Sequence, residues 1–314
     1  MIRLVADQHI LEKCRWRKRI NGRNEEGVSF ADKCVTLAVI EEYIYLIQAM
    51  GASQLISFYK YQGTGNDFVM VDDRKAAWDL GNTARITALC DRKFGIGADG
   101  LILIRSHADY DFEVVYFNVD GSQSFCGNGA RCAVAFAAFL GIITQHARFL
   151  AIDGPHEASL TDGLVSLKMG DVSEISESLG DAFVHTGSPH HVRWVEDVET
   201  YPVFEQGQVL RHDPCYAPAG SNVNFVQKLG DSEIFVRTFE RGVENETLSC
   251  GTGVTAAALV CGALTQQNSI QIRTLGGNLR VTFEGNTHTG FTNIWLIGPA
   301  QQVFSGQFRL KDFH

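Results

Sequence analysis

Two short segments that nearly repeat each other constrain this chain more than any other feature. They read Cys126-Gly127-Asn128-Gly129-Ala130 and Cys250-Gly251-Thr252-Gly253-Val254, and a run of small residues follows each one. These runs predict two helices, each with a cysteine at its first turn. Free backbone N–H groups and the positive end of the helix dipole lie there, so we expect them to favour thiolate over thiol and to hold an anion. A matched pair of this kind predicts two thiols that face one substrate.

The stretches between these segments alternate in the manner of short β-strands with Gly, Asn and Asp turns. The order of strands, cysteine helix and strands occurs twice, which predicts an α+β protein of two similar domains related by a pseudo-twofold axis. We expect the boundary near Met169 to Ser173 and the active site in the cleft between the domains. The strands are expected at 68–71, 101–104, 112–117, 164–168, 183–185, 223–226, 234–239, 270–273, 279–283 and 293–297.

Composition excludes several classes of function. The 314 residues carry a formal net charge of −9, which argues against binding to nucleic acid or to an anionic membrane surface. The apolar stretch Val35 to Met50 contains two glutamates and is too short to span a bilayer. Eight cysteines without a Cys-x-x-Cys pair or a secretory signal favour reduced thiols and no zinc site. We therefore expect a cytoplasmic protein without a bound metal.

Two further patterns suggest other chemistry. Gly95 to Gly100 matches Gly-x-Gly-x-x-Gly, but it precedes an expected strand, whereas a dinucleotide site follows one and opens a helix. We interpret these glycines as turn residues. His190 and His191 in a turn-like segment could pair with one cysteine in a thiol-dependent hydrolase, a reading that leaves the second cysteine segment unexplained. The other six cysteines are interpreted as ordinary buried or surface residues.

Three further motifs occur together with the cysteine segments: Gly63–Phe68, Phe117–Ser122 and Phe239–Gly242. Each could be a simple turn or a surface ion pair by itself, but their joint occurrence favours a shared function. With them, the chain closely resembles the diaminopimelate epimerase family over nearly everything from Phe58 to about Leu310. Residues 1 to 56 fall outside the resemblance and are expected to be an extension of unknown role, or to precede a start at Met50. The matching segments are Gly63–Phe68, Phe117–Ser122, Cys126–Arg131, Gly187–His190, Ser221–Phe225, Phe239–Gly242 and Cys250–Gly253.

The resemblance assigns roles to individual positions. Cys126 and Cys250 match the two catalytic thiols, and His190 and Glu240 match polar residues that tune them. Two positions depart from the family pattern: Ser188 stands where asparagine is frequent, and Gly100 stands where some members have glutamine, so no side-chain contact is expected from position 100. The positions that match substrate-binding residues are Asn66, Asn118, Gly127, Asn128, Ser188, Asn222, Glu240, Arg241, Gly251 and Thr252.

The resemblance also implies a fold and a reaction. Each domain is expected to be a curved, mostly antiparallel sheet around a central helix, with domains over 57–171 and 172–298 and with 299–314 returning to the first. The expected reaction converts LL-diaminopimelate to meso-diaminopimelate, for lysine and peptidoglycan-precursor synthesis, by two thiols that exchange a proton with the α-carbon. No cofactor is expected, and the only expected partner is the small-molecule substrate, with a homodimer left open. The alternatives are a proline or hydroxyproline racemase of the same fold, the hydrolase, and a binding protein without activity.

Overall fold

A computed structural model of the chain describes residues 55–313, so the extension expected over residues 1–56 lies almost wholly outside the described part. The first strand already begins at Leu55. The first half of the fold contains helices α3 (Thr83–Cys90) and α4 (Gly127–Phe139) and the strands β1 (Leu55–Gly63), β2 (Asn66–Asp72), β3 (Gly100–Arg105), β4 (Phe112–Asn118), β5 (His146–Ala151), β6 (Gly154–Thr161) and β7 (Leu164–Lys168).

The second half follows the same plan. It contains α5 (Val203–Arg211), the short 3₁₀ helix η1 (Pro214–Tyr216) and α6 (Gly251–Thr265). Its strands are β8 (Ser176–Ser178), β9 (Asp181–His185), β10 (Pro189–Trp194), β11 (Asn222–Lys228), β12 (Glu233–Glu240), β13 (Asn245–Thr247), β14 (Ser269–Thr274), β15 (Gly277–Asn286) and β16 (Gly290–Pro299). The chain then continues into β17 (Gln301–Arg309) and the 3₁₀ helix η2 (Leu310–Asp312).

Strand pairing shows that the two halves are copies of one topology. In the first half β1 and β2 are antiparallel, β2 and β3 parallel, β3 and β4 antiparallel, β4 and β5 parallel, and β5, β6 and β7 antiparallel in turn. The strands β9, β10, β11, β12, β14, β15 and β16 repeat that sequence of pairings. The predicted α+β fold with an internal duplication is therefore confirmed, and α4 and α6 occupy equivalent places in it.

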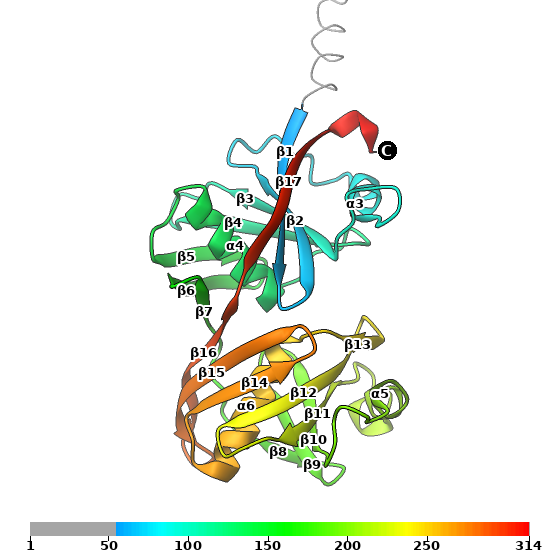
Figure 1. Ribbon diagram of the computed structural model, residues 1–314, viewed down its shortest axis with the longest axis vertical. Helices are drawn as coiled ribbons and strands as arrows, with labels where there is room; N and C mark the ends of the chain where they lie inside the picture. Colours follow the sequence, from blue (N-terminus) through cyan, green and yellow to red (C-terminus); the bar gives the residue numbers. More distant parts are fainter. Residues whose placement is uncertain (1–54, 314) are drawn as a thin grey trace, which may run out of the picture. The chain divides into compact units, whose positions relative to one another are not determined.

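The last strand completes the first sheet. Strand β17 pairs antiparallel with β1, just as the short β8 pairs with β9 in the second half. Figure 1 shows β17, in red, running beside β1, which is about 250 residues earlier in the chain. The end of the chain thus protects an edge of the first sheet that would otherwise be open to pairing with another chain.

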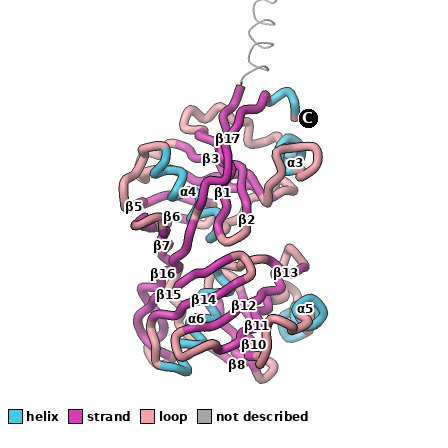
Figure 2. Tube along the Cα trace, in the orientation of Figure 1, coloured by secondary structure: helices cyan, strands magenta, loops and turns pink. Residues whose placement is uncertain are grey.

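Each central helix is buried on nearly all sides, as Figure 2 shows for the helices drawn among the strands. Helix α4 contacts β1, β2, β3, β4, β6 and β7, and α6 contacts β9 to β12 and β14 to β16. A helix enclosed in this way needs small residues so that a curved sheet can approach it. Ala133 and Ala137 serve this purpose in α4, and Ala256 to Ala258 in α6, all fully buried.

The two halves are joined by a strand pair and by a tight turn contact. Strand β7 pairs antiparallel with its equivalent β16, with Leu167 opposite Leu296. The turn between β1 and β2 also packs on the second half, because a Cβ placed on Gly276 would lie only 1.8 Å from the carbonyl oxygen of Thr64. Both contacts lie within one compact unit that covers residues 55–314.

Within residues 55–313, no helix combines the length and the apolar character that crossing a bilayer requires.

The turn contact predicts a sharp difference between two glycines. Gly276→Ala places a methyl group against the backbone of Thr64, which cannot move aside as a flexible side chain could, so the free energy of unfolding should fall by about 1–3 kcal/mol. Gly230→Ala is the matched control, because its Cβ would be 3.9 Å from Glu233 Cβ, its nearest neighbour. Urea unfolding of both variants measures the difference, and equal midpoints would show that this contact does not constrain the two halves.

Candidate active site

The two repeated cysteines occupy the same position in equivalent helices. Cys126 is the N-cap residue of α4, with φ −133° and ψ 116°, and Cys250 is the N-cap residue of α6, with φ −113° and ψ 113°. Both residues are extended, and the helix begins at the glycine that follows each of them. The glycine-rich segments thus place both sulfur atoms beside the free N–H groups of a first helical turn.

The two helices meet at these N-termini. A Cβ on Gly251 would be 3.8 Å from the Cα of Gly127 and 3.1 Å from Leu296. The side chain of Asn128 crosses the junction and donates a hydrogen bond of 3.0 Å to the carbonyl oxygen of Ser249. The two helix starts thus lie side by side, with Leu296 packed against them, so the positive ends of both dipoles point into one small region.

Burial dominates the protonation of both thiols. Burial raises the pKa of Cys126 to about 11, although the N–H groups of Gly129 and Asn128 lower it. Burial also raises the pKa of Cys250, with a further rise from the carboxylate of Glu240. The expectation that the helix ends alone would favour thiolate is therefore wrong for the ligand-free protein, because the loss of hydration disfavours the anion more than a few N–H bonds stabilise it.

Asn66 lies beside Cys126 and is held by an aspartate that the sequence analysis did not single out. Its Oδ1 is 3.4 Å from the sulfur of Cys126, and its Nδ2 donates a 2.6 Å hydrogen bond to Asp99. Arg92 in turn pairs with Asp99 at 2.7 Å. Asp99 therefore fixes which end of the Asn66 amide faces the thiol. The only sequence signal was the turn Gly97-Ala98-Asp99-Gly100, which leads into β3 and was interpreted as a turn alone.

The turn that carries Asn66 is anchored by a buried arginine. Arg131 is 0% exposed, and its guanidinium donates a 3.1 Å hydrogen bond to the hydroxyl of Thr64. Its Nε and Nη1 have no hydrogen-bond partner among the described residues. In the second copy the same position of the motif is Thr255, whose hydroxyl donates to the carbonyl of Gly251 within its own helix. The two thiols therefore differ in their charged surroundings, because only the Cys126 helix carries a buried cation.

Three predicted binding residues of the second half form one hydrogen-bonded group. Asn222 donates to the hydroxyl of Ser188 at 2.8 Å and accepts the backbone N–H of Arg241 at 2.9 Å. The guanidinium of Arg241 reaches the same Ser188 hydroxyl at 3.3 Å. A guanidinium, an amide and a hydroxyl gathered in this way suit a carboxylate ligand. Although Ser188 is shorter than the asparagine that is frequent at this position, its hydroxyl contacts both Asn222 and Arg241.

Glu240 connects the electrostatics of the two thiols. It lies at the end of β12, and burial raises the pKa of its carboxyl group, while a 2.9 Å hydrogen bond from Thr247 lowers it. Its negative charge raises the pKa of both Cys126 and Cys250. A buried carboxylate with one hydroxyl donor has unused capacity to pair with a cation.

His190 is buried beneath the second cysteine helix and is neutral near physiological pH. It is 0% exposed, and burial lowers its pKa to about 3. The amide of Asn224 lies 3.1 Å from its Nδ1 and also donates to the backbone carbonyl of His191, so Nδ1 accepts and the proton resides on Nε2. That Nε2 has no partner among the described residues. His190 can therefore offer a hydrogen bond to the site, but not a positive charge.

The remaining predicted residues occupy different surroundings. Thr252 has its hydroxyl 3.6 Å from the sulfur of Cys250, and its carbonyl accepts a hydrogen bond from Thr186. Asn118 ends β4 and directs its amide to Ser122 and Ser124 within its own turn. Hydrogen bonds connect Asn66 with Cys126 and Asn128, and Asn128 with the residue before Cys250. The charge of Glu240 acts on both thiols, whereas the side chain of Asn118 bonds to the loop that precedes Cys126.

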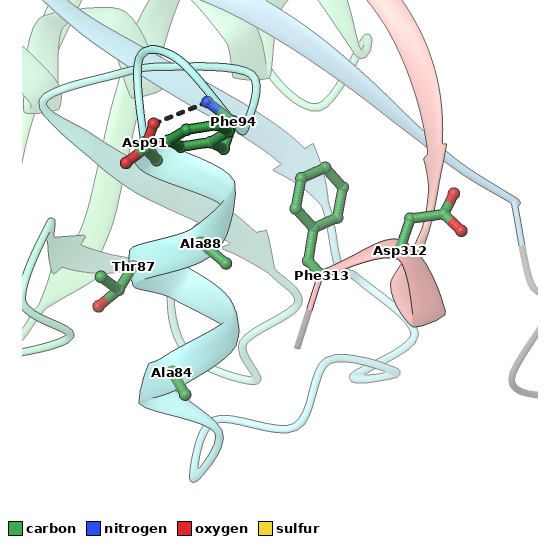
Figure 3. A pocket seen from close by; sticks show the side chains of 7 residues that line it. All are labelled: Ala84, Thr87, Ala88, Asp91, Phe94, Asp312 and Phe313. Carbon is green, nitrogen blue, oxygen red and sulfur yellow. Dashed lines mark hydrogen bonds between the residues drawn. The ribbon is translucent and has the colours of Figure 1, made fainter.

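Away from the cysteine helices, the described residues form a shallow hollow but no metal site. Residues 55–313 contain no group of three or more His, Cys, Asp or Glu side chains arranged to hold a metal ion. A hollow between α3 and the chain end, shown in Figure 3, is lined by Ala84, Thr87, Ala88, Asp91, Phe94, Asp312 and Phe313. It has two acidic side chains and otherwise small or aromatic groups, and none of the predicted site residues. The predicted site residues therefore lie near the cysteine helices and not at this hollow.

Comparison with known proteins agrees with this architecture. Solved structures with the same fold include a phenazine biosynthesis protein of the PhzF family from Bacillus anthracis, with a TM-score of 0.65, 12% identity and coverage of 81% of this chain and 99% of that one. A hydroxyproline epimerase from Agrobacterium vitis gives a TM-score of 0.60 at 17% identity, with coverage of 83% and 92%. The fold is thus the duplicated two-domain fold found in epimerases of this kind.

Sequence comparison identifies the family. The family model for diaminopimelate epimerase matches residues 58–175 and 182–303. A diaminopimelate epimerase from Flavobacterium psychrophilum is 48% identical over 253 residues, which cover 79% of this chain and 98% of that protein. One from Aquifex aeolicus is 36% identical over 275 residues, with coverage of 80% and 97%. The chain belongs to the diaminopimelate epimerase family, a family of isomerases.

The raised pKa of the first thiol gives a testable reactivity. In ligand-free Cys250→Ala protein, alkylation of Cys126 by iodoacetamide should stay slow at neutral pH and accelerate up to about pH 11, well above the range of a free cysteine with a pKa of about 8.5. Mass spectrometry of the Cys126 peptide at a series of pH values gives the profile. A midpoint near neutral pH would show that the helix end outweighs burial.

Burial of neutral His190 predicts a loss of stability in acid. Its pKa is lower in the folded state than the unfolded value of about 6.5, so the unfolded chain binds the proton first as the pH falls. The stabilising contribution is complete above that value and decreases by up to about 1.4 kcal/mol per pH unit below it. Urea unfolding between pH 7 and pH 4 should show a weaker pH dependence in His190→Gln, which retains a group able to accept from Asn224. His191, whose pKa is also lowered by burial, is present in both proteins and cancels in the comparison.

Proposed function

We propose that this protein converts LL-diaminopimelate to meso-diaminopimelate by proton transfer between the α-carbon and the thiols of Cys126 and Cys250. The observation that carries the proposal is the convergence of two equivalent helix N-termini, each capped by a cysteine. Inversion of a tetrahedral carbon requires proton removal on one face and proton delivery on the other. One base would have to move around the substrate, whereas two bases on opposite faces need no such movement. Family membership and the Flavobacterium relative support the choice of substrate.

The helix ends supply the electrostatic part of the proposed reaction. When the α-proton leaves, negative charge develops on the substrate carboxylate, which becomes enolate-like. Backbone N–H groups at Gly127, Asn128, Gly251 and Thr252 would hold that carboxylate where both dipoles are positive. In other enzymes the loss of one such donor costs about 3 kcal/mol of transition-state stabilisation. Several donors acting together are the proposed substitute for the electron sink that a cofactor provides elsewhere.

Substrate binding would also activate the thiols. The charge of Glu240 raises the pKa of both Cys126 and Cys250 in the ligand-free protein. A substrate ammonium group paired with Glu240 would neutralise that charge and bring a cation into the buried site. Both effects favour thiolate, so we propose that the reactive form of the enzyme develops only with the amino acid in place. The group formed by Ser188, Asn222 and Arg241 would bind the second carboxylate of a diamino diacid.

The alternatives fit the site less well. Proline and hydroxyproline have one carboxylate, so they would leave the Arg241 group without a ligand. A thiol hydrolase needs a cysteine hydrogen-bonded to a histidine. Among the described residues, Cys126 bonds to Asn66 and Cys250 to Thr252, while Nδ1 of His190 faces Asn224. We further propose that the protein acts in the reducing cytoplasm, because the reaction needs two free thiols side by side. The homodimer stays a prediction.

The decisive experiment follows solvent-proton exchange in heavy water without any added cofactor. Wild-type protein should incorporate deuterium at the α-carbon of LL- or meso-diaminopimelate and interconvert the two, while proline should not exchange. Cys126→Ala and Cys250→Ala should each lose activity by about 10²-fold or more, because each removes one acid or base. Cys215→Ala, which removes an exposed free thiol, is the control and should retain activity. Substantial epimerisation by either active-site variant would contradict the two-base scheme.

A further inference from the structure

Tyr116 brings a polar group to the active site from the core face of β4. Alternate residues of this strand, Phe112, Val114 and Tyr116, share the face that packs toward α4. The first two are buried in the main apolar core, and Tyr116 is the last of the row and only partly buried. It lines a small cavity together with Cys126 and Gly129 at the start of α4. The alternation of the strand therefore places a phenol, rather than another apolar side chain, beside the first thiol.

Glycine at position 100 makes room for this ring. A Cβ on Gly100 would lie 2.5 Å from Cε2 of Tyr116 and 3.1 Å from its hydroxyl oxygen. The carbonyl oxygen of Phe117 would be closer still, at 2.4 Å, so this ring and the backbone of β4 together fill the space into which a side chain at position 100 would project. Gly100 directly follows Asp99, which holds Asn66 against the sulfur of Cys126. The hydroxyl group consequently lies near the residues that surround the first thiol.

Within residues 55–313 no group is hydrogen-bonded to this hydroxyl, and the residue is only partly buried, so the hydroxyl is available to a polar group that enters the cavity. Burial raises the pKa of Tyr116, so the phenol stays protonated and can both donate and accept. Acidic groups from both halves of the fold raise it further: the thiol of Cys126 and the carboxylate of Asp99 from the first, and Glu240 from the second. An unpaired donor and acceptor at this position is a place for a polar group of a ligand.

We propose that the hydroxyl of Tyr116 hydrogen-bonds the bound diamino diacid beside Cys126, and that it does so in place of a side chain at position 100. This inference rests on the proposed function. It assigns to the substrate site a residue that neither the repeated motifs nor the family resemblance singled out. It also explains why glycine stands at position 100, because a larger residue there would displace the ring.

Removal of the hydroxyl alone tests the inference. In Tyr116→Phe the ring still packs against Gly100 and Phe68, so the fold should be kept. The KM for diaminopimelate should rise about ten- to hundredfold, as expected for a lost hydrogen bond to a charged group, while kcat stays within about twofold. Tyr59→Phe is the matched control, because that ring packs against Phe136 and Phe139 at the other end of α4. It should leave both constants unchanged.

A second measurement separates contact with the substrate from an effect on the thiol. The pH profile of Cys126 alkylation in the ligand-free protein should be the same with and without the Tyr116→Phe change. A shifted profile would overturn the inference, because the hydroxyl would then act on the thiol. An unchanged KM, or a fall in kcat alone, would overturn it as well. Loss of exchange in the wild type would instead refute the proposed function, and this inference with it, whereas an active wild type with an unaffected variant refutes the inference alone.

Discussion

The structure depends on the close approach of two helix N-termini. A Cβ on Gly251 would be in van der Waals contact with the Cα of Gly127, and Asn128 fixes the junction through the carbonyl of Ser249. Two positive dipole ends that face each other are unfavourable when nothing negative lies between them. The packing of the two sheets around α4 and α6 supplies the stability that holds this arrangement. The result is a region prepared for an anion, with a sulfur atom at the start of each helix.

Burial has two consequences in this region. It removes water from the thiols and raises their pKa, which favours the protonated form of both cysteines. It also strengthens every interaction with a charged ligand, because screening by water is lost. Glu240 is the group through which a ligand cation would act on both thiols at once. In the proposed reaction the acidity of the thiols is therefore a property of the complex rather than of the free protein.

Internal duplication supplies the symmetry, and a few differences between the copies break it. The equivalent strands β7 and β16 pair with each other at the junction, as equivalent elements do beside a twofold axis. Arg131 in the first copy is matched by Thr255 in the second, so the two cysteine helices differ by a buried positive charge. Asn66 and Asp99 flank the first thiol, whereas Thr252 flanks the second. The two ends of diaminopimelate carry the same groups, so in the proposed reaction an asymmetric site would bind one end at the thiols and the other end away from them.

The sequence by itself determined those features of the protein that local residue patterns specify. The two cysteine segments, the helices after them and the repeated order of strands are readable because small residues and β-branched or aromatic runs have strong local preferences. Resemblance to the family then predicted binding roles for Asn66, Asn222, Glu240 and Arg241, which no local pattern distinguishes from ordinary turn and surface residues. Neither source indicated Asp99 or Tyr116, whose importance comes from what lies opposite them after folding. Only the tertiary structure decided the protonation of the thiols, since desolvation depends on how many atoms from distant parts of the chain surround each sulfur. It also decided the partner of β1, because β17 joins that strand across nearly the whole described chain and no local preference of either segment specifies the other.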